Sequence, residues 1–347
     1  MKNQYLLFIT LFAFAFSNAQ IVDIPDYAFK NRLVNYNCVD TDGNGGPDAD
    51  ADTNNDGEIQ VSEAEAVINL ILHGYEWEQI YSLEGIQSFQ NIERLSFSDN
   101  SVSELDITQN QNLLWLECPF NLLTSLDVSQ NPNLLFLWCS FNDLTNLDVS
   151  NNLNLRSLSC SSNQFTSLDV SNNEMLYAIS CIYSQLSNLD VSQNPNLELL
   201  RCYGSNLLMS LNIKNGNNDI IETMLAFDNP NLTCILVDDE NTNYPNCDSD
   251  NDLGWCKDEW ASYSEDCELG LEDNTQISFT IYPNPVQDIL NIEPQLPLET
   301  VEIYNLQGQL ISESSKSRVD VSQLNAGLYF LQVIIDGKKA TKKFIKE

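Results

Sequence analysis

The residues with the clearest chemistry lie in one acidic segment, which reads DTNNDGEIQVSE over positions 52–63. Calcium takes about six to eight oxygen ligands from a flexible loop, and a glycine at the sixth position allows the sharp turn. Gly57 stands at that position. The segment therefore predicts a structural Ca²⁺ site. Its oxygen donors at positions 1, 3, 5, 7 and 12 are Asp52, Asn54, Asp56, Glu58 (through its backbone carbonyl) and Glu63.

A second, weaker site is predicted directly upstream. Asp40, Asp42 and Asn44 occupy the first, third and fifth positions of the same template, but no glutamate follows at the twelfth. The alternative is an acidic linker that holds no ion. The complete loop resembles an EF-hand loop, and the partial loop resembles the Asp-rich calcium repeats of secreted proteins. The resemblance implies flanking helices, at 27–35 and 64–71. A dockerin-like module, which would pair with a partner domain, is the weaker interpretation.

Catalytic constellations are missing from the sequence. His73 is the only histidine, and no Ser/His/Asp order, zinc-ligand spacing or phosphate-binding loop accompanies it. A pair of carboxylates could cleave glycosides. With 50 acidic residues in the chain, however, no particular pair is informative. We therefore predict that the protein is not an enzyme.

A repeat of 21 residues organises the middle of the chain. One unit, 134–154, reads LLFLWCSFNDLTNLDVSNNLN. Its Leu-x-x-Leu-x-Cys portion places alternate side chains on one face of a short strand, and stacking parallel strands buries them in columns. Three columns keep the 21-residue spacing: Cys118, Cys139, Cys160, Cys181 and Cys202; Leu116, Leu137, Leu158, Ile179 and Leu200; and Leu105, Leu126, Leu147, Leu168 and Leu189.

This unit resembles the leucine-rich repeat in a short bacterial form, most like internalin-type surface proteins. The resemblance implies a leucine-rich-repeat solenoid with one short parallel β-strand per coil and a mostly irregular convex side. The asparagines at 100, 121, 142 and 163 resemble the asparagine ladder of that family. The ladder lapses at Ser184, and the register slips near Asn206 and Leu211, so an irregular coil is expected there.

The ten cysteines divide into two groups. The five in the repeat take an inward strand position where other coils carry Phe or Leu, so we predict reduced, buried thiols. Four others lie where the repeats end, beside Trp255 and Trp260. An open solenoid end needs a cap, and disulfides could staple a short one. Of the three possible pairings we favour Cys234–Cys267 with Cys247–Cys256, which leaves Cys38 over.

Aromatic residues gather at the outward strand positions of two adjacent coils. Such a density of exposed rings often marks a binding surface. They could stack on sugar rings or anchor a protein partner, unless neighbouring coils cover them. The Ser-rich coils after position 155 look inert by comparison. The candidate ligand-binding residues are Trp115, Phe120, Phe136, Trp138 and Phe141.

The last seventy residues have a different pattern, with short alternating strands that suggest a small C-terminal β-sandwich. The motifs YPNP at 282–285, VEIYNLQGQ at 301–309, GLYFLQV at 327–333 and the basic end KKFIKE resemble the sorting domain of type IX secretion substrates. The resemblance implies that residues 278–347 engage the type IX secretion machinery. It also implies that this tail is removed after export.

The chain begins with a predicted secretory signal: Lys2, an apolar run from Leu6 to Phe16, and the small-residue site Ser17-Asn18-Ala19. No later apolar run approaches the length of a membrane span. The net charge is −35, although 278–347 are nearly neutral. Such an acidic body repels nucleic acid. Part of the charge is an Asp column expected to hydrogen-bond the following turns: Asp106, Asp127, Asp148, Asp169 and Asp190.

Together these patterns predict a secreted or surface-attached, calcium-stabilised binding protein. Its partner would be an extracellular protein, as in adhesion. The alternatives are a polysaccharide ligand or a passive role in a surface layer. The expected organisation is a signal peptide (1–19), an N-terminal helical cap with the calcium loop (20–66), the solenoid (67–238), a disulfide-containing cap (239–268), a linker (269–277) and the sorting domain (278–347).

Overall fold

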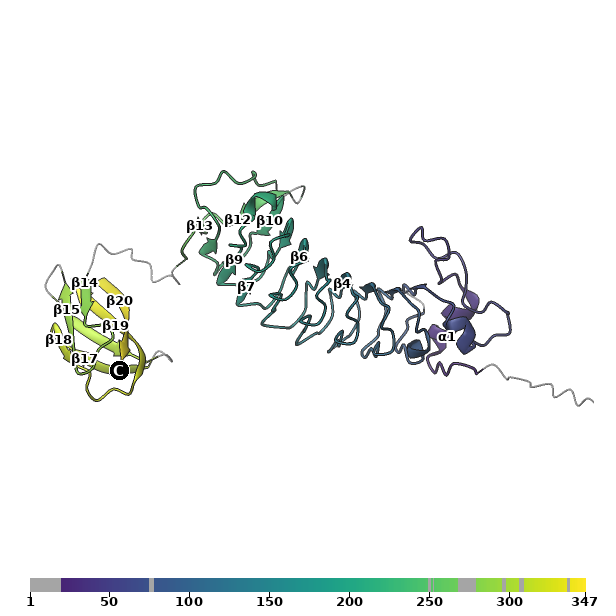
Figure 1. The fold of residues 1–347 in the computed structure, drawn as a ribbon, viewed down its shortest axis with the longest axis horizontal. Helices are drawn as coiled ribbons and strands as arrows, with labels where there is room; N and C mark the ends of the chain where they lie inside the picture. Colours follow the sequence, from purple (N-terminus) through teal and green to yellow (C-terminus); the bar gives the residue numbers. More distant parts are fainter. Residues whose placement is uncertain are drawn as a thin grey trace, which may run out of the picture. The chain divides into compact units, whose positions relative to one another are not determined.

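The computed structural model describes residues 20–74, 78–248, 251, 253–267, 279–294, 298–305, 309–335 and 338–347. The predicted signal (1–19) and linker (269–277) lie outside the described residues. The chain divides into two compact units, Met1–Glu265 and Asp266–Glu347 (Figure 1). Each unit has a hydrophobic core of its own.

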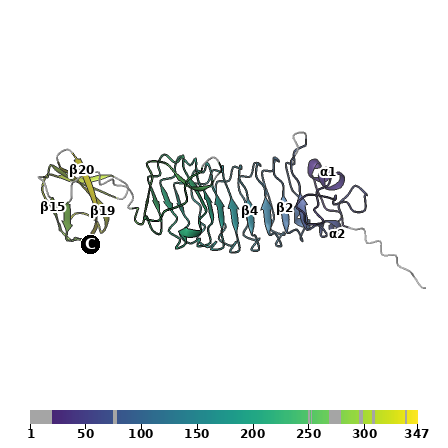
Figure 2. The same cartoon turned by 90° about the horizontal axis from the view of Figure 1, so that it is seen from above.

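The first unit is a solenoid built on a nine-stranded parallel sheet, whose strands follow one another along it (Figure 2). Each repeat contributes one short strand in the predicted register, so that Leu116 pairs with Leu137 and Leu137 with Leu158. The leucine-rich-repeat solenoid is thereby confirmed. In spatial order its strands are β1 (Asn69–Ile71), β2 (Arg94–Ser96), β3 (Trp115–Glu117), β4 (Phe136–Trp138), β5 (Ser157–Ser159), β6 (Ala178–Ser180), β8 (Leu199–Arg201), β10 (Thr223–Ala226) and β12 (Gly254–Lys257).

A second parallel sheet runs beside the last coils. Leu189 pairs in it with Leu211, 22 residues later, which is the predicted slip of register. Two 3₁₀ helices, η1 (Ile86–Ser88) and η2 (Asn218–Ile220), complete the coils. The strands of this sheet are β7 (Asn188–Asp190), β9 (Ser210–Asn212), β11 (Cys234–Leu236) and β13 (Ser262–Ser264).

Two columns of asparagine tie the coils together. In the predicted column, Asn142 Nδ2 donates to the Cys118 and Cys139 carbonyls at 3.0 and 3.1 Å. At the lapse, the Ser184 and Ser205 hydroxyls form a hydrogen bond of 2.9 Å instead. The second column was not predicted, although its 21-residue period is visible in the sequence. Its members are fully buried, and each donates to two carbonyls of the preceding coil: Asn110, Asn131, Asn152, Asn173 and Asn194.

The predicted aspartate column is also explained by local bonding. The Asp127 side chain accepts a hydrogen bond of 2.9 Å from the Ser129 backbone N–H. The side chain of every other aspartate in the column likewise accepts a hydrogen bond from the backbone N–H two residues later. Hydrogen bonding to the ionised form keeps the pKa of Asp148 below its usual value. This column therefore shapes the turns of the solenoid.

The segment before the first coil covers the edge of the sheet. Helix α1 spans Tyr27–Asn35, as predicted, and Asp26 caps it by accepting a hydrogen bond from the Phe29 N–H at 2.9 Å. Phe29 and Leu33 are fully buried in the solenoid core. The chain then bonds to β1, because the Ile71 N–H donates to the Cys38 carbonyl at 2.7 Å. This contact leaves the first strand without an open edge.

The prediction of an exiting helix over 64–71 is wrong. Helix α2 contains only Val61–Ala64, and residues 69–71 form β1. Leu70 is fully buried and lies opposite Leu95 in the sheet. Pairing with the neighbouring coil therefore overrides a local helical pattern, because a short helix is only marginally stable by itself.

The far end of the solenoid is closed by an aromatic cap. The ring of Trp255 stacks on Tyr244 with centroids 3.8 Å apart, and its Nε1 donates to the Ile221 carbonyl at 2.8 Å. Gly254 has φ +76°, and a Cβ there would lie 1.9 Å from the Asn246 carbonyl oxygen. A glycine is therefore required where this cap folds back.

The C-terminal unit consists of two antiparallel sheets around one core, which confirms the predicted sandwich. Fully buried Phe344 and Leu331 belong to that core. The sheets are β14 (Phe279–Tyr282), β15 (Ile289–Pro294) and β18 (Arg318–Asp320), and β17 (Leu310–Ser314), β16 (Thr300–Tyr304), β19 (Gly327–Ile335) and β20 (Lys338–Lys346).

The five repeat cysteines and Cys38 are free and buried. Burial raises the pKa of Cys139 and of Cys181 to about 12, since a thiolate is poorly solvated there. We expect no labelling of these six thiols in the native chain at pH 8 and full labelling after denaturation, measured by mass spectrometry. Rapid labelling of the native chain would contradict this packing.

Candidate functional site

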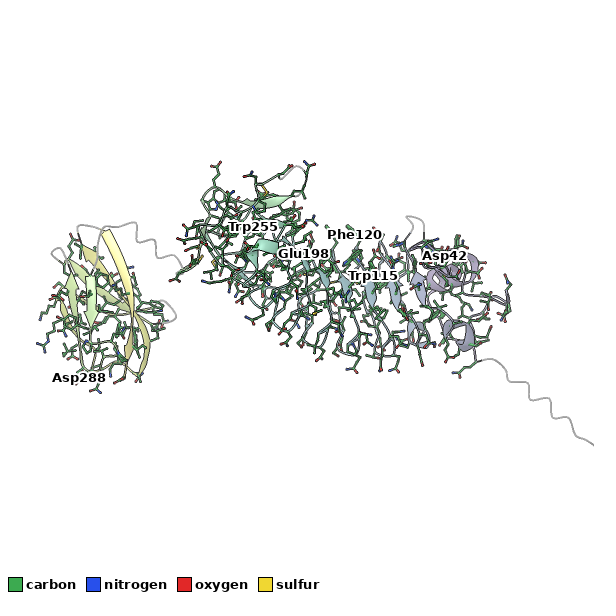
Figure 3. All side chains as sticks on the ribbon, turned by 45° about the horizontal axis from the view of Figure 1, so that its top comes forward. Asp42, Trp115, Phe120, Glu198, Trp255 and Asp288 are labelled. Atoms are coloured by element: carbon green, nitrogen blue, oxygen red, sulfur yellow. A yellow bond between two sulfur atoms is a disulfide. The ribbon has the colours of Figure 1, made fainter. Side chains whose placement is uncertain are left out.

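The predicted aromatic residues form a cluster on the solvent-facing side of the nine-stranded sheet, which we call the strand face. Trp115 stacks on Phe136 with ring centroids 4.5 Å apart and meets Trp138 edge-on at 5.1 Å. All three side chains are half-buried, because they cover one another across β3 and β4. Phe120 and Phe141 remain open, with 49% and 45% of their surface exposed. Figure 3 shows Trp115 and Phe120 on the same side of the solenoid.

The exposed rings stand in a column with an unusual backbone. Phe120, Phe141 and Tyr183 all have positive φ, between 51° and 56°. Left-handed backbone is uncommon for bulky residues and costs roughly 1–3 kcal/mol each. The repeat therefore holds large apolar side chains, which face solvent, at a position with strained backbone.

A second aromatic group, which the sequence analysis did not single out, lies further along the same face. Tyr203 stacks on Phe227 with centroids 4.7 Å apart and meets Tyr183 edge-on at 5.8 Å. The signal was present in the chain, since Tyr183 occupies the same repeat position as Phe141. Tyr203 also keeps the 21-residue spacing, since it lies 21 residues after Ile182, and only Phe227 is hidden by the break in that spacing after position 205.

Between the two aromatic groups lies a hollow of about 500 Å³. Small side chains, among them Ser157, Ser159 and Ser180, form its floor, and Trp138, Phe141 and Tyr203 stand around it. The Ser-rich coils, which were expected to be inert, therefore provide the floor of this hollow. Small residues on two coils, flanked by large rings on both sides, create the depression that a ligand can enter.

Two arginines on the strand face differ in their surroundings. Arg94 pairs with Glu117 at 3.2 Å and lies over the Trp115 ring, 4.9 Å from its centroid. Arg201 lines the hollow, and its Nε is buried without a hydrogen-bond partner. Among the residues that the structure describes, no carboxylate forms an ion pair with Arg201. Its guanidinium is therefore available to an anionic group.

The predicted calcium loop at 52–63 is tightly ordered by its own acids. The two carboxylate oxygens of Asp52 accept hydrogen bonds from the Asp56 and Gly57 backbone N–H groups at 3.2 and 2.8 Å. Glu63 is buried and accepts bonds from the Asn54 and Gln60 N–H groups at 3.1 and 3.0 Å, which joins the two ends of the loop.

The partial loop has the same design. Asp40 accepts hydrogen bonds from the Gly43 and Gly45 N–H groups at 2.8 and 2.9 Å, and the last of these matches the bond from Gly57 to Asp52. Asp42 and Asn44 are exposed and bond to each other at 2.9 Å. The two loops thus have equivalent first turns, and they differ in how the loop is closed.

The complete loop fits calcium in its donor types and in its backbone. Gly57 has φ +85°, which suits the sharp turn at that position. Glu58 is the seventh residue of the loop and would offer its backbone carbonyl to the ion, while its side chain forms an ion pair with Lys30. The carboxylates are turned toward backbone N–H groups, however. No group of three or more His, Cys, Asp or Glu side chains in the described part of the chain is gathered closely enough to hold a metal.

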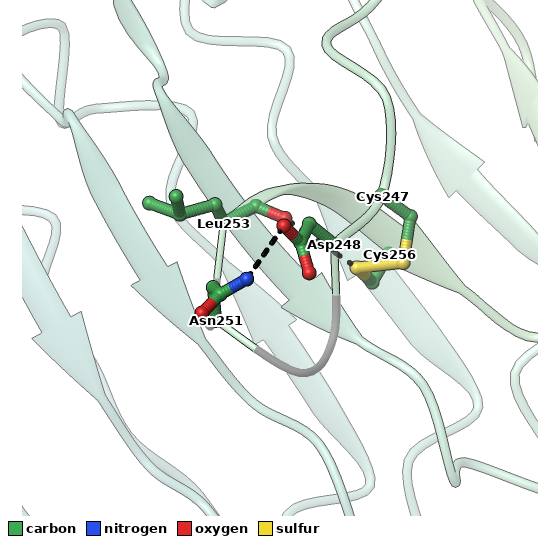
Figure 4. The surroundings of a disulfide bond; sticks show 5 residues. All are labelled: Cys247, Asp248, Asn251, Leu253 and Cys256. Atoms are coloured by element: carbon green, nitrogen blue, oxygen red, sulfur yellow. Dashed lines mark hydrogen bonds between the residues drawn. A yellow bond between two sulfur atoms is a disulfide. The ribbon is translucent and has the colours of Figure 1, made fainter.

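The cap carries disulfides. Cys247 is bonded to Cys256 (Figure 4). Cys234 and Cys267 are also disulfide-bonded. The first bridge closes a short loop in which Asn251 Nδ2 donates to Asp248 at 2.9 Å. The bridge therefore holds β12 against the segment before it, next to the stacked ring of Trp255.

Stacked parallel strands with buried columns of leucine define a solenoid of the leucine-rich-repeat fold. Residues 280–347 match the family model described as a secretion system C-terminal sorting domain. The predicted resemblance of the tail to a sorting domain is thereby confirmed. No curated protein matches the chain.

Solved structures with similar folds include bacterial leucine-rich-repeat proteins. A leucine-rich-repeat protein of Leptospira interrogans is 23% identical over 52% of this chain and 45% of its own, with a TM-score of 0.42. The functional domain of InlJ from Listeria monocytogenes, which includes a cysteine ladder, is 16% identical over 84% of this chain and 93% of its own, with a TM-score of 0.29. Internalin C2 of that organism is 20% identical over 46% and 76%, with a TM-score of 0.33.

The chain spans less than half the length of the Leptospira protein. With such low identities and TM-scores, the assignment of the fold rests on the repeats and strand pairing of this chain. In the described residues, no helix has both the length and the apolar character needed to cross a membrane.

Proposed function

We propose that this protein is exported and binds an extracellular protein partner through the strand face. The observation that carries the proposal is the hollow of about 500 Å³ between two aromatic groups, which include exposed rings on strained backbone. Exposed aromatic clusters of this kind are typical of interaction surfaces. The solenoid is a rigid scaffold of the type that generally binds rather than catalyses.

The polysaccharide alternative is less well supported by the rings themselves. Sugar recognition by stacking requires open ring faces. The faces of Trp115 and Phe136 are turned toward each other, as are those of Phe120 and Phe141. A polymer laid along the strand face would therefore meet mainly ring edges. A protein partner can use edges, hydroxyl groups and the hollow together.

Binding can be tested by incubating the full-length chain with arrays of immobilised extracellular proteins and of soluble glycans. We expect binding to a protein and a loss of about ten-fold or more in affinity for Trp138→Ala, because interface aromatics dominate binding energy. Leu153→Ala is the control, since Leu153 is 58% exposed in a turn outside the sheet. Binding to glycans alone would support the polysaccharide alternative, and equal loss in the control would refute the proposed surface.

Export by type IX secretion is the second part of the proposal. It is supported by the match of residues 280–347 to a C-terminal sorting domain. We infer that this unit engages the secretion machinery and that the solenoid is then released or held at the outer cell surface. The separate core of this unit is consistent with its removal, because neither core depends on residues of the other.

The third part is a structural role for calcium at residues 52–63. The loop is bonded to the start of the described chain, since the Val22 N–H donates to the Ile59 carbonyl at 2.8 Å. Bound calcium would neutralise Asp52, Asp56 and Glu63 together, which removes the repulsion between acids in a small space. The loop would then hold the cap firmly on the first coil. The partial loop at Asp40, Asp42 and Asn44 is a weaker candidate for a second ion.

A further inference from the structure

One repeat position on the strand face carries a small residue where its neighbours carry rings. The column runs Phe120, Phe141, Ser162, Tyr183 and Gly204, and all five have positive φ. Ser162 therefore interrupts a row of aromatic side chains without a change in the backbone. The interruption lies inside the hollow, whose lining includes Phe141, Ser162 and Tyr183.

The ring of Tyr183 is folded away from this gap. A Cβ atom added to Gly204 would lie 2.4 Å from two carbons of the Tyr183 ring, so the ring lies directly over Gly204. Only glycine permits this position, because any side chain would collide with the ring. The space above Ser162 consequently remains open, and we call this space the slot.

Phe141 offers the slot a free aromatic face. Its ring and that of Phe120 are nearly parallel, at 11°, with centroids 4.3 Å apart. That separation is close to the spacing of about 4.8 Å between neighbouring strands, so the ring normals run along the column. One face of Phe141 is covered by Phe120, and the other is directed toward the position above Ser162. A flat group placed there would continue the existing stack.

Arg201 provides a charge at a defined distance from the slot. Its strand, β8, lies two strands beyond β5 in the sheet, which places it about 10 Å from the coil of Ser162. An extended peptide advances about 3.3 Å per residue. A carboxylate two or three residues from an inserted ring would therefore reach Arg201. Arg201 forms no ion pair among the described residues, and a carboxylate of the segment would supply the opposite charge that a neutral segment lacks.

We propose that the slot takes an aromatic side chain from an extended segment of the protein partner, and that Arg201 binds a carboxylate two or three residues away in that segment. This inference rests on the proposed binding function and specifies its ligand. A single inserted ring uses the one open face, whereas a row of sugar rings would need several. The recognised motif is thus an aromatic residue followed or preceded closely by an acid.

The test is selection from a display library of random peptides on the full-length chain, followed by affinity measurement with the enriched peptides. Ser162→Phe fills the slot with a residue that Phe120 and Phe141 already show to be compatible with this backbone. Ser162→Ala leaves the slot open and is its matched control. Arg201→Gln removes the charge, and Arg156→Gln removes an exposed arginine outside the strand face as its control. Circular dichroism confirms that each variant is folded.

We expect enriched peptides with an aromatic residue two or three positions from an acid. Their affinity should fall about ten-fold or more in Ser162→Phe and in Arg201→Gln, and should stay unchanged in both controls. If the affinity of the peptides falls in Trp138→Ala but not in Ser162→Phe, the slot proposal is overturned. The strand face then remains the binding surface. If no peptide is enriched, or if the enriched peptides lack an aromatic residue, the slot proposal is overturned as well. If, in addition, no protein of the array binds, the proposed function fails with it.

Discussion

Replacement of Leu137 by alanine is expected to lower the free energy of unfolding of the solenoid by about 3 kcal/mol, within a usual range of about 2–5 kcal/mol. Leu137 is fully buried in β4, between Leu116 and Leu158 of the adjacent coils. The deletion removes apolar burial and leaves a cavity, because the coils on both sides are held in register by their own hydrogen bonds. Urea unfolding of the full-length chain, followed by circular dichroism, measures the change.

Leu122→Ala is the matched control for this substitution. Leu122 has the same side chain in the adjacent coil but is 50% exposed, so we expect a change within about 0.5 kcal/mol. A loss in the control as large as that in Leu137→Ala would mean that the columns of leucine do not hold the solenoid together. The pair therefore tests the repeat architecture and not only the sensitivity of one residue.

Calcium is expected to stabilise the first unit by about 2.7 kcal/mol when its free concentration is a hundred times Kd. The reason is that an ion bound only by the folded loop shifts the folding equilibrium. Thermal melts of the full-length chain in millimolar calcium and in chelator measure this effect. Glu63→Gln should abolish most of the difference between the two conditions, because it removes the charge at the twelfth position.

Glu63 also has a role without metal, since it accepts hydrogen bonds from the Asn54 and Gln60 backbone. Some destabilisation of Glu63→Gln in chelator is therefore expected, and only the calcium-dependent part tests the ion. Glu65→Gln is the control, because Glu65 is an exposed acid at the end of the same short helix. Identical melts of the native chain in calcium and in chelator would refute the calcium role and leave the loop as a hydrogen-bonded cap.

The repeat unit by itself determined most of the fold. A strict 21-residue period fixes which side chains point inward, so the strands, their parallel register and the buried cysteines followed from the sequence. The same is true of the C-terminal sandwich, whose alternating strands and motifs are local. The loop at 52–63 was also visible, because its donors are close in sequence. Periodic and local patterns carry this information without any knowledge of distant contacts.

The tertiary structure decided what depends on contacts between distant segments. Residues 64–71 leave the helical pattern because β1 gains a partner in β2. Phe227 joins Tyr203 and Tyr183 only because the irregular coil brings it to the strand face. The slot above Ser162 requires Gly204 to accept the ring of Tyr183. Such features arise from the shapes of side chains in three dimensions, and a one-dimensional pattern of polarity does not record shape.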